Sequence, residues 1–147
     1  TTKIKVRVVG DTEATKTTGL VRRLLDEQSS PRADVWWSSE PLGTVRLARE
    51  GVLDSLPEPF IPKGWPATLV GAGRSWVGFA QRARVIAFST KRVSVEERPT
   101  RLRELVEPRW KGRIGMARPQ FGTTRTQMAA LLAVSGERAL RGWLSGL

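Results

Sequence analysis

The chain has 147 residues, of which 39% are hydrophobic and 27% charged, a composition typical of a folded domain. Cysteine, histidine and tyrosine are absent. This excludes disulfides, thiol catalysis and metal sites built on Cys or His, so a bound metal would need oxygen ligands. No apolar window is long enough to predict a transmembrane helix, and no signal sequence is visible at the N-terminus.

The net charge is +11, from 25 Lys and Arg against 14 Asp and Glu. A basic surface suits nucleic acid, an acidic membrane or an anionic ligand. The basic residues are spread along the whole chain, and no basic helix is interleaved with aromatic residues. We therefore interpret the charge mainly as a solvated coat, with a small anionic ligand as the next interpretation and nucleic acid as the last.

The first half of the chain predicts strands that alternate with helices. Alternating apolar residues predict a strand at 3–9, and a compact apolar run predicts a buried strand at 33–37. Helical spacing predicts helices at 15–28 and 41–50, the second ended by Gly51. Four prolines between residues 54 and 66 predict a long irregular segment.

The second half continues the alternation. Strands are predicted at 76–79, 84–89 and 112–117, the middle one buried on both faces, and helices at 99–106, 123–134 and 137–144. Strands alternating with helices predict an α/β fold with a mostly parallel sheet. In such a fold, ligands bind where strands end and helices begin.

The first strand-to-helix junction carries Thr12 and Glu13 in a turn rich in hydroxyl residues. Hydroxyls and backbone N–H groups at a helix start suit an anion. Ordinary capping of the helix by Thr12 or Thr15 explains the same residues and is the preferred interpretation of this segment alone.

The second junction places Ser38, Ser39 and Glu40 before the helix predicted to start at Pro41. Glu40 is either a helix cap or a ligand for a cation or hydrogen-bond donor, and both interpretations stay open. Trp36 and Trp37, just before them, are predicted to pack mainly in the core.

The third junction has Gly122, Thr123 and Thr124 at the start of an apolar helix. Glycine permits a close backbone approach, so the outline is that of an anion cradle. The signal is weaker than a phosphate-binding P-loop, because the lysine and the full glycine spacing are missing.

Enzymatic chemistry has little support. No nucleophile motif of the Gly-x-Ser-x-Gly kind, no histidine and no clear carboxylate pair is present, so we predict that the chain is not an enzyme.

Several segments together resemble a known family, the extracellular solute-binding proteins of bacterial ABC importers, in their ferric-iron-binding branch. The resemblance lies in residues 8–14, 19–25, 33–40, 76–88 and 99–119, whose order and spacing it follows. It implies a periplasmic-binding-protein-like (type II) two-lobed α/β clamp. Residues 1–83 would form part of lobe one, 84–92 the hinge crossover and 93–147 part of lobe two.

The resemblance also implies roles for individual residues. Glu40 matches the acidic residue that iron-binding members place after the second strand, which makes it a metal ligand. Gly122, Thr123 and Thr124 match the helix start that holds a companion anion, and Arg82 would approach the anion from the hinge. The tyrosine pair of ferric sites would fall beyond Leu147, and a histidine used by some members would fall before Thr1.

The expected function is therefore the substrate-binding component of an ABC importer. It would capture a small solute, ferric iron (Fe³⁺) with a companion anion or a small anion alone, without a required cofactor. The expected partner is the membrane permease, not nucleic acid, and the expected location is periplasmic or extracellular, with a lipoprotein anchor in the parent protein.

Family members are considerably longer than this chain. We therefore expect an incomplete clamp with open sheet edges that favour self-association. The alternatives are the ligand-sensing domain of a regulator and a basic nucleic-acid-binding module; an enzyme of a related transferase type lacks a catalytic pair here.

Overall fold

The computed structural model describes residues 2–11, 18–120 and 122–147. The chain forms two compact units. Unit 1 consists of Thr1–Phe79 and Gln120–Thr126, and unit 2 of Ala80–Pro119 and Gln127–Leu147. The division into lobes and a hinge at 1–83, 84–92 and 93–147 stays a prediction.

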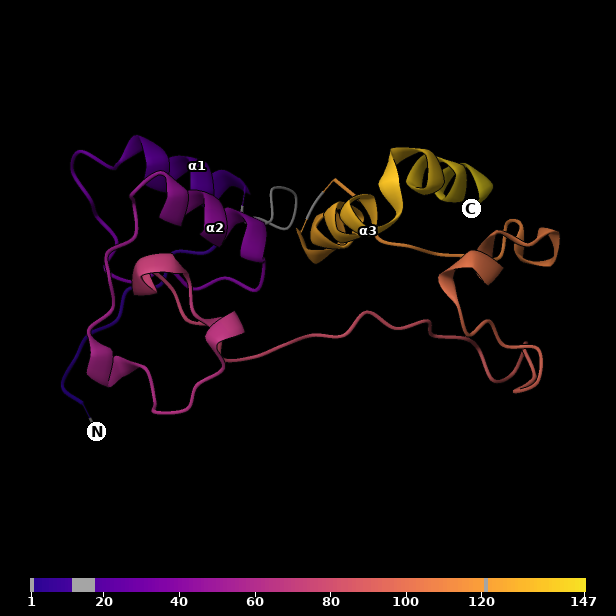
Figure 1. Cartoon of the computed structure of the whole chain (residues 1–147), viewed down its shortest axis with the longest axis horizontal. Helices are drawn as coiled ribbons and strands as arrows, with labels where there is room; N and C mark the ends of the chain where they lie inside the picture. The colour runs from indigo at the N-terminus through magenta and orange to yellow at the C-terminus, as the bar shows by residue number, and fades with distance from the viewer. Residues whose placement is uncertain (1, 12–17, 121) are drawn as a thin grey trace. The chain divides into compact units, whose positions relative to one another are not determined.

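The secondary structure of the described residues is helical (Figure 1). The α-helices are α1 (Thr18–Asp26), α2 (Pro41–Arg49) and α3 (Gly122–Gly146). The 3₁₀-helices are η1 (Glu58–Phe60), η2 (Ala67–Leu69), η3 (Ala72–Arg74), η4 (Leu102–Val106) and η5 (Pro108–Trp110). Between them, the one β-bridge in the described part of the chain pairs Val70 with Val77.

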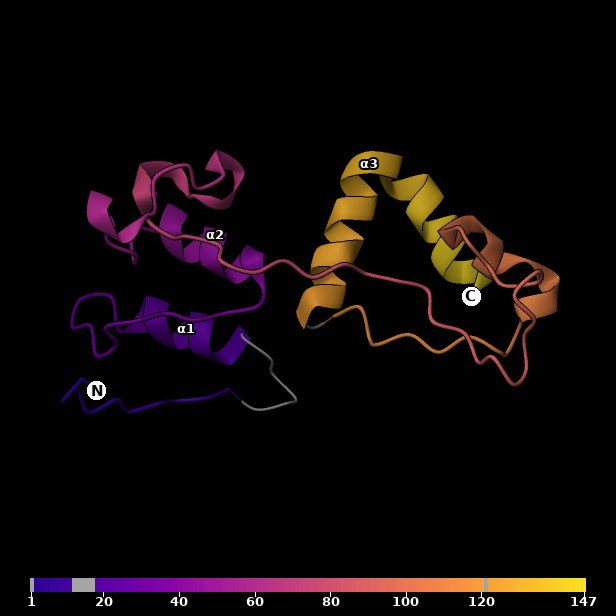
Figure 2. The ribbon, with the colours of Figure 1, turned by 90° about the horizontal axis from the view of Figure 1, so that it is seen from below.

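In unit 1, α1 and α2 lie side by side (Figures 1 and 2). Each presents the apolar stripe that its sequence predicts, and the best-buried side chains are Val21 from α1 and Leu47 from α2, at 6% and 0% exposure. Gly51, with φ of 71°, follows α2 in the left-handed conformation expected of a helix stop. The predicted helix at 41–50 is thus confirmed, and that at 15–28 is confirmed over Thr18–Asp26.

The predicted strands are wrong for the described residues. The stretches at 3–9, 33–37, 84–89 and 112–117 have no ladder partner, and residues 76–79 take part in the single bridge at Val77. Many apolar residues of these stretches stay in solvent: Ile4, Val8, Val35 and Val85 are each at least 74% exposed. The physical reason is that a strand can bond its backbone only to a neighbour, and these stretches have none here.

The sequence predicts that Trp36 and Trp37 pack mainly in the core, and neither is fully buried. Trp36 is half-buried, and its indole N–H donates to the Thr44 hydroxyl at 2.9 Å. Trp37 is 76% exposed and meets Phe79 edge-on, with ring centroids 5.0 Å apart. An exposed aromatic pair replaces the buried strand expected there.

Helix α3 covers both helices predicted near the C-terminus. The break between them is Gly136, whose φ of 80° and ψ of 166° leave the helical region. Glycine accepts this conformation at little steric cost, so the two helical patterns in the sequence form one element with a sharp kink. Among the described helices, none is both long enough and apolar enough to cross a membrane.

Unit 2 is held by contacts between its 3₁₀-helices and the end of α3. The Trp143 indole N–H donates to the Leu102 carbonyl oxygen at 2.8 Å. A Cβ on Gly146 would lie 2.9 Å from the side chain of Val106, so glycine lets the end of α3 pack directly against this side chain. The helix predicted at 99–106 is shorter and tighter than expected, because η4 begins only at Leu102.

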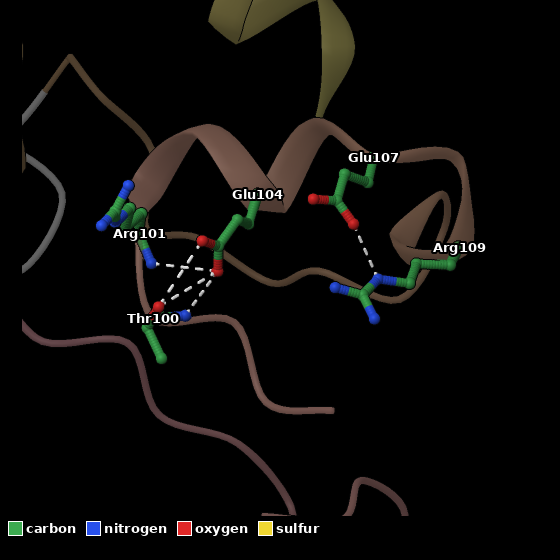
Figure 3. A network of polar contacts seen from close by, with 5 residues as sticks. All are labelled: Thr100, Arg101, Glu104, Glu107 and Arg109. Carbon is green, nitrogen blue, oxygen red and sulfur yellow. Dashed lines mark hydrogen bonds and ion pairs between the residues drawn. The ribbon is translucent and has the colours of Figure 1, made fainter. Parts of the chain in front are cut away.

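The Glu104 carboxylate closes the start of η4 (Figure 3). It accepts hydrogen bonds from the backbone N–H of Thr100 at 2.7 Å and of Arg101 at 3.3 Å, and from the Thr100 hydroxyl. The bond from the Thr100 N–H contributes most to lowering the pKa of Glu104, because these donors favour the charged carboxylate. Nearby, Glu107 pairs with Arg109 at 2.8 Å (Figure 3).

We expect this network to make the stability of η4 depend on pH. The pKa of Glu104 is lower in the folded chain, so its contribution is present above the unfolded pKa and is lost as pH falls through the folded value. A carbon-detected NMR titration should show Glu104 protonating below the usual range for glutamate. Glu104→Gln should remove this part of the acid response, whereas Glu96→Gln should leave it; an ordinary Glu104 titration would contradict the assignment.

Candidate functional site

The candidate site centres on Glu40, which caps α2. Its backbone is extended (φ −115°, ψ 112°), and its two carboxylate oxygens accept the N–H groups of Leu42 at 2.9 Å and Gly43 at 2.8 Å. Pro41 follows at the first helical position, where no N–H is needed. The negative charge also lies at the positive end of the helix dipole, so the cap is electrostatically favourable.

Ser38 holds the chain just before the cap. Its hydroxyl oxygen accepts the Glu40 N–H at 3.0 Å and donates to the Glu40 carbonyl oxygen at 3.2 Å. This local turn fixes the backbone from which the carboxylate projects. The capping interpretation of the sequence is thereby confirmed for Glu40.

The same carboxylate reaches the start of α3. The Thr126 hydroxyl donates to Glu40 Oε1 at 2.6 Å, across 86 positions of sequence and within unit 1. Glu40 is 7% exposed, and Thr124, two residues before Thr126, is 3% exposed. One buried carboxylate therefore satisfies donors from two helix starts, as a charged group out of water requires.

The structure brings together only part of the predicted set. Ser38 is half-buried beside Glu40, while Ser39 is exposed. Gly122 has a φ of 55°, Thr123 is half-buried and Thr124 is buried at the start of α3. Thr12 and Glu13 lie outside the described residues, and Arg82 is exposed and belongs to unit 2.

Thr126 is the residue that sequence reasoning missed. It lies one turn inside the predicted helix, where the sequence offers no reason to choose it over Thr123 or Thr124. Its role depends on a contact with a residue far away in the chain, and no local pattern encodes that contact. The cluster of threonines at 123–126 was the available signal.

The chemistry open to this site follows from its donors and acceptors. Glu40 is an anionic acceptor among hydroxyls and N–H groups. Over residues 2–11, 18–120 and 122–147, no three acidic side chains gather as a metal cluster would require. A cation at Glu40 would therefore draw its other ligands from hydroxyls, carbonyls, water or a companion anion.

Comparison with known proteins identifies the family. Residues 46–147 match the family model described as bacterial extracellular solute-binding protein. The chain therefore belongs to the bacterial extracellular solute-binding protein family. This family is non-enzymatic, which agrees with the lack of a catalytic motif in the sequence.

The curated relatives fall in the ferric-iron-binding branch. The chain is 31% identical over 150 residues to the major ferric iron-binding protein of Neisseria meningitidis serogroup B, covering 99% of this chain and 43% of the relative. It is 28% identical over 145 residues to iron uptake protein A1 of Synechocystis and to the Fe(3+)-binding periplasmic protein of Serratia marcescens. Both alignments cover 99% of this chain, with 39% and 40% of the respective relatives.

The chain thus spans well under half the length of these relatives. No solved structure gives a significant match. The family is established, whereas the closed two-lobed α/β clamp is not seen in the described residues, which contain no strand longer than one bridge.

We expect the Glu40–Thr126 bond to stabilise the start of α2. Thr126→Val removes the hydroxyl at nearly constant shape, and hydrogen bonds to charged groups contribute about 1.5–3 kcal/mol. Amide hydrogen exchange at Leu42, which shares Oε1 with Thr126, should accelerate accordingly. Thr68→Val, at an exposed position of unit 1, should leave this exchange unchanged.

Glu40→Asp completes the test as a double-mutant cycle. Aspartate remains a good helix cap but is one methylene too short to keep both sets of contacts. Adding Thr126→Val to Glu40→Asp should therefore cost much less than Thr126→Val alone. Fully additive effects would show that the two side chains do not interact.

Proposed function

We propose that the chain is part of the substrate-binding component of a bacterial ABC importer and captures ferric iron with a companion anion, or a small anion alone. The observation that carries the proposal is the buried Glu40 carboxylate at the joint start of α2 and α3. Family membership and the iron-related names of the relatives support it.

The proposed roles divide between the two helix starts. Glu40 would contribute one carboxylate oxygen to the cation, exchanging at least one of its present hydrogen-bond donors for the metal. The start of α3, with Gly122, Thr123 and Thr124, would favour the companion anion through its dipole and hydroxyls. A trivalent cation beside an anion is a hard-acid, oxygen-rich combination that suits this set of residues.

The rest of the arrangement is also proposed. The chain would contribute parts of both lobes of a type II clamp, with Ser38, Ser39 and Arg82 along the ligand-facing edges and Thr12 and Glu13 at the first junction. Closure would exclude water and present the liganded form to the membrane permease. The protein would act in the periplasm or outside the cell, anchored as a lipoprotein.

The alternatives receive less support. A basic nucleic-acid module rests on the net charge of +11 alone, and a ligand-sensing domain of a regulator would need a DNA-binding segment next to this chain. The solute-binding family match favours capture for transport over both.

Ferric binding is tested by separating the charge of Glu40 from its capping role. Asparagine and aspartate both cap helices well, but only aspartate keeps the negative charge. Calorimetric titration with ferric nitrilotriacetate, with and without phosphate, should show binding to the unmodified chain. Glu40→Asn should weaken it by about tenfold or more, equivalent to about 1.4 kcal/mol, while Glu40→Asp should stay closer to the original affinity.

Glu58→Gln serves as the control, because Glu58 is an exposed acid elsewhere in unit 1. It should leave the affinity unchanged. Equal weakening by Glu58→Gln and Glu40→Asn would reduce the effect to general electrostatics, and no binding to the unmodified chain would remove the proposal for these residues.

A further inference from the structure

Unit 2 contains a basic pocket that the proposed ligand site does not use. The pocket has a volume of about 130 Å³, room for a group larger than one water molecule. Three of its lining residues are arginines and one is a glutamate, so its lining has a net charge of +2. The lining residues are Arg92, Val93, Glu97, Arg109, Trp110 and Arg113.

A tight turn at residues 110–113 forms one side of the pocket. The N–H of Arg113 donates to the carbonyl oxygen of Trp110 at 2.9 Å, and Lys111 between them has φ −56° and ψ 126°. Gly112 follows with φ of 72°, which completes the geometry of a type II turn and requires glycine at that position. The turn brings Arg113 back onto the residue that begins it.

Both neighbouring arginines lie over the Trp110 ring. Their guanidinium carbons are 5.1 Å (Arg109) and 5.5 Å (Arg113) from its centroid. Arg109 also pairs through Nε with Glu107 at 2.8 Å. These contacts place both guanidinium groups against one aromatic ring, and both arginines line the pocket.

Trp110 carries a buried hydrogen-bond donor that is unsatisfied. It is 7% exposed, and its indole N–H is buried with no hydrogen-bond partner among the described residues. An unsatisfied buried donor costs about 1–3 kcal/mol, and the indole nitrogen can only donate. The group that would satisfy this donor is an acceptor, and the group that a lining with a net positive charge attracts is an anion.

We propose that this pocket binds a small tetrahedral oxyanion of the phosphate or sulfate class. Guanidinium groups offer paired N–H donors that match such oxygens. The Trp110 N–H, whose nitrogen is closed to solvent, would add a donor on a small shift of the ring that uncovers it to the pocket. The site is separate in sequence from the anion position proposed at the start of α3. Its occupation by an anion would tie η5 and residues 111–113 to Arg92.

The test follows the Trp110 indole signal in two-dimensional NMR while inorganic phosphate or sulfate is added to the full chain in chloride buffer. Trp110→Phe assigns that signal and keeps an aromatic ring for the arginines while removing the donor. We expect a saturable shift of the Trp110 indole proton, with chloride alone having no such effect. Arg113→Gln should weaken phosphate binding about tenfold or more, and Trp110→Phe should weaken it several-fold by calorimetry.

Arg141→Gln is the matched control, because Arg141 is an exposed arginine of unit 2 that pairs with Glu137 in the same helix and does not line the pocket. It should leave phosphate affinity unchanged. Arg92→Gln provides a second variant at the pocket if Trp110→Phe disturbs folding, and it should weaken binding as Arg113→Gln does.

The result that overturns the proposal is the absence of a saturable Trp110 shift up to about 10 mM phosphate, a range that covers even millimolar affinity. Equal weakening by Arg141→Gln and Arg113→Gln would overturn it too, since it would reflect net charge alone. Glu40→Asn should not change this binding, so failure of the ferric-iron proposal and failure of the pocket proposal are distinguishable.

Discussion

The hydrogen bonds to the Glu40 carboxylate are the constraint on which the arrangement of unit 1 depends. Glu40 is only 7% exposed, so its carboxylate must find donors, and it finds two N–H groups in α2 and one hydroxyl in α3. Because those donors come from segments distant in sequence, satisfying one charge also fixes where α3 begins relative to α2. Glu40, which caps α2, thereby also lies beside the start of α3.

The difference between the predicted and observed folds follows from how helices and strands satisfy their backbones. A helix bonds within itself, so Pro41–Arg49 forms wherever its cap and stop residues are present. A strand depends on a neighbour, and residues 3–9 and 33–37 have the right alternation or apolar content but no ladder partner in the described chain. The chain covers 39–43% of the length of these relatives. A segment can therefore carry the sequence pattern of a strand while the described chain offers no neighbouring strand to pair with it.

The candidate site was predictable to the extent that it is local. Glu40 as a cap follows from residues two and three positions away. Thr126 was not predictable, since its partner lies 86 positions back. The turn from Trp110 to Arg113 is partly predictable. The pair Lys111-Gly112 favours a type II turn, but which arginines lie over the indole ring depends on packing.

The charge of the chain can now be interpreted by position rather than as a total. A net charge of +11 attracts anions in general but selects none. Selection requires fixed polar groups, and the two proposed sites would use different ones. Glu40 and the threonine hydroxyls would serve a cation with its companion anion, and the guanidinium groups of the pocket would serve an oxyanion alone. A ferric complex with anions would be drawn by the same overall field. The acidic residue at the start of α2 would then distinguish the metal from a free anion, for which the arginine pocket is proposed.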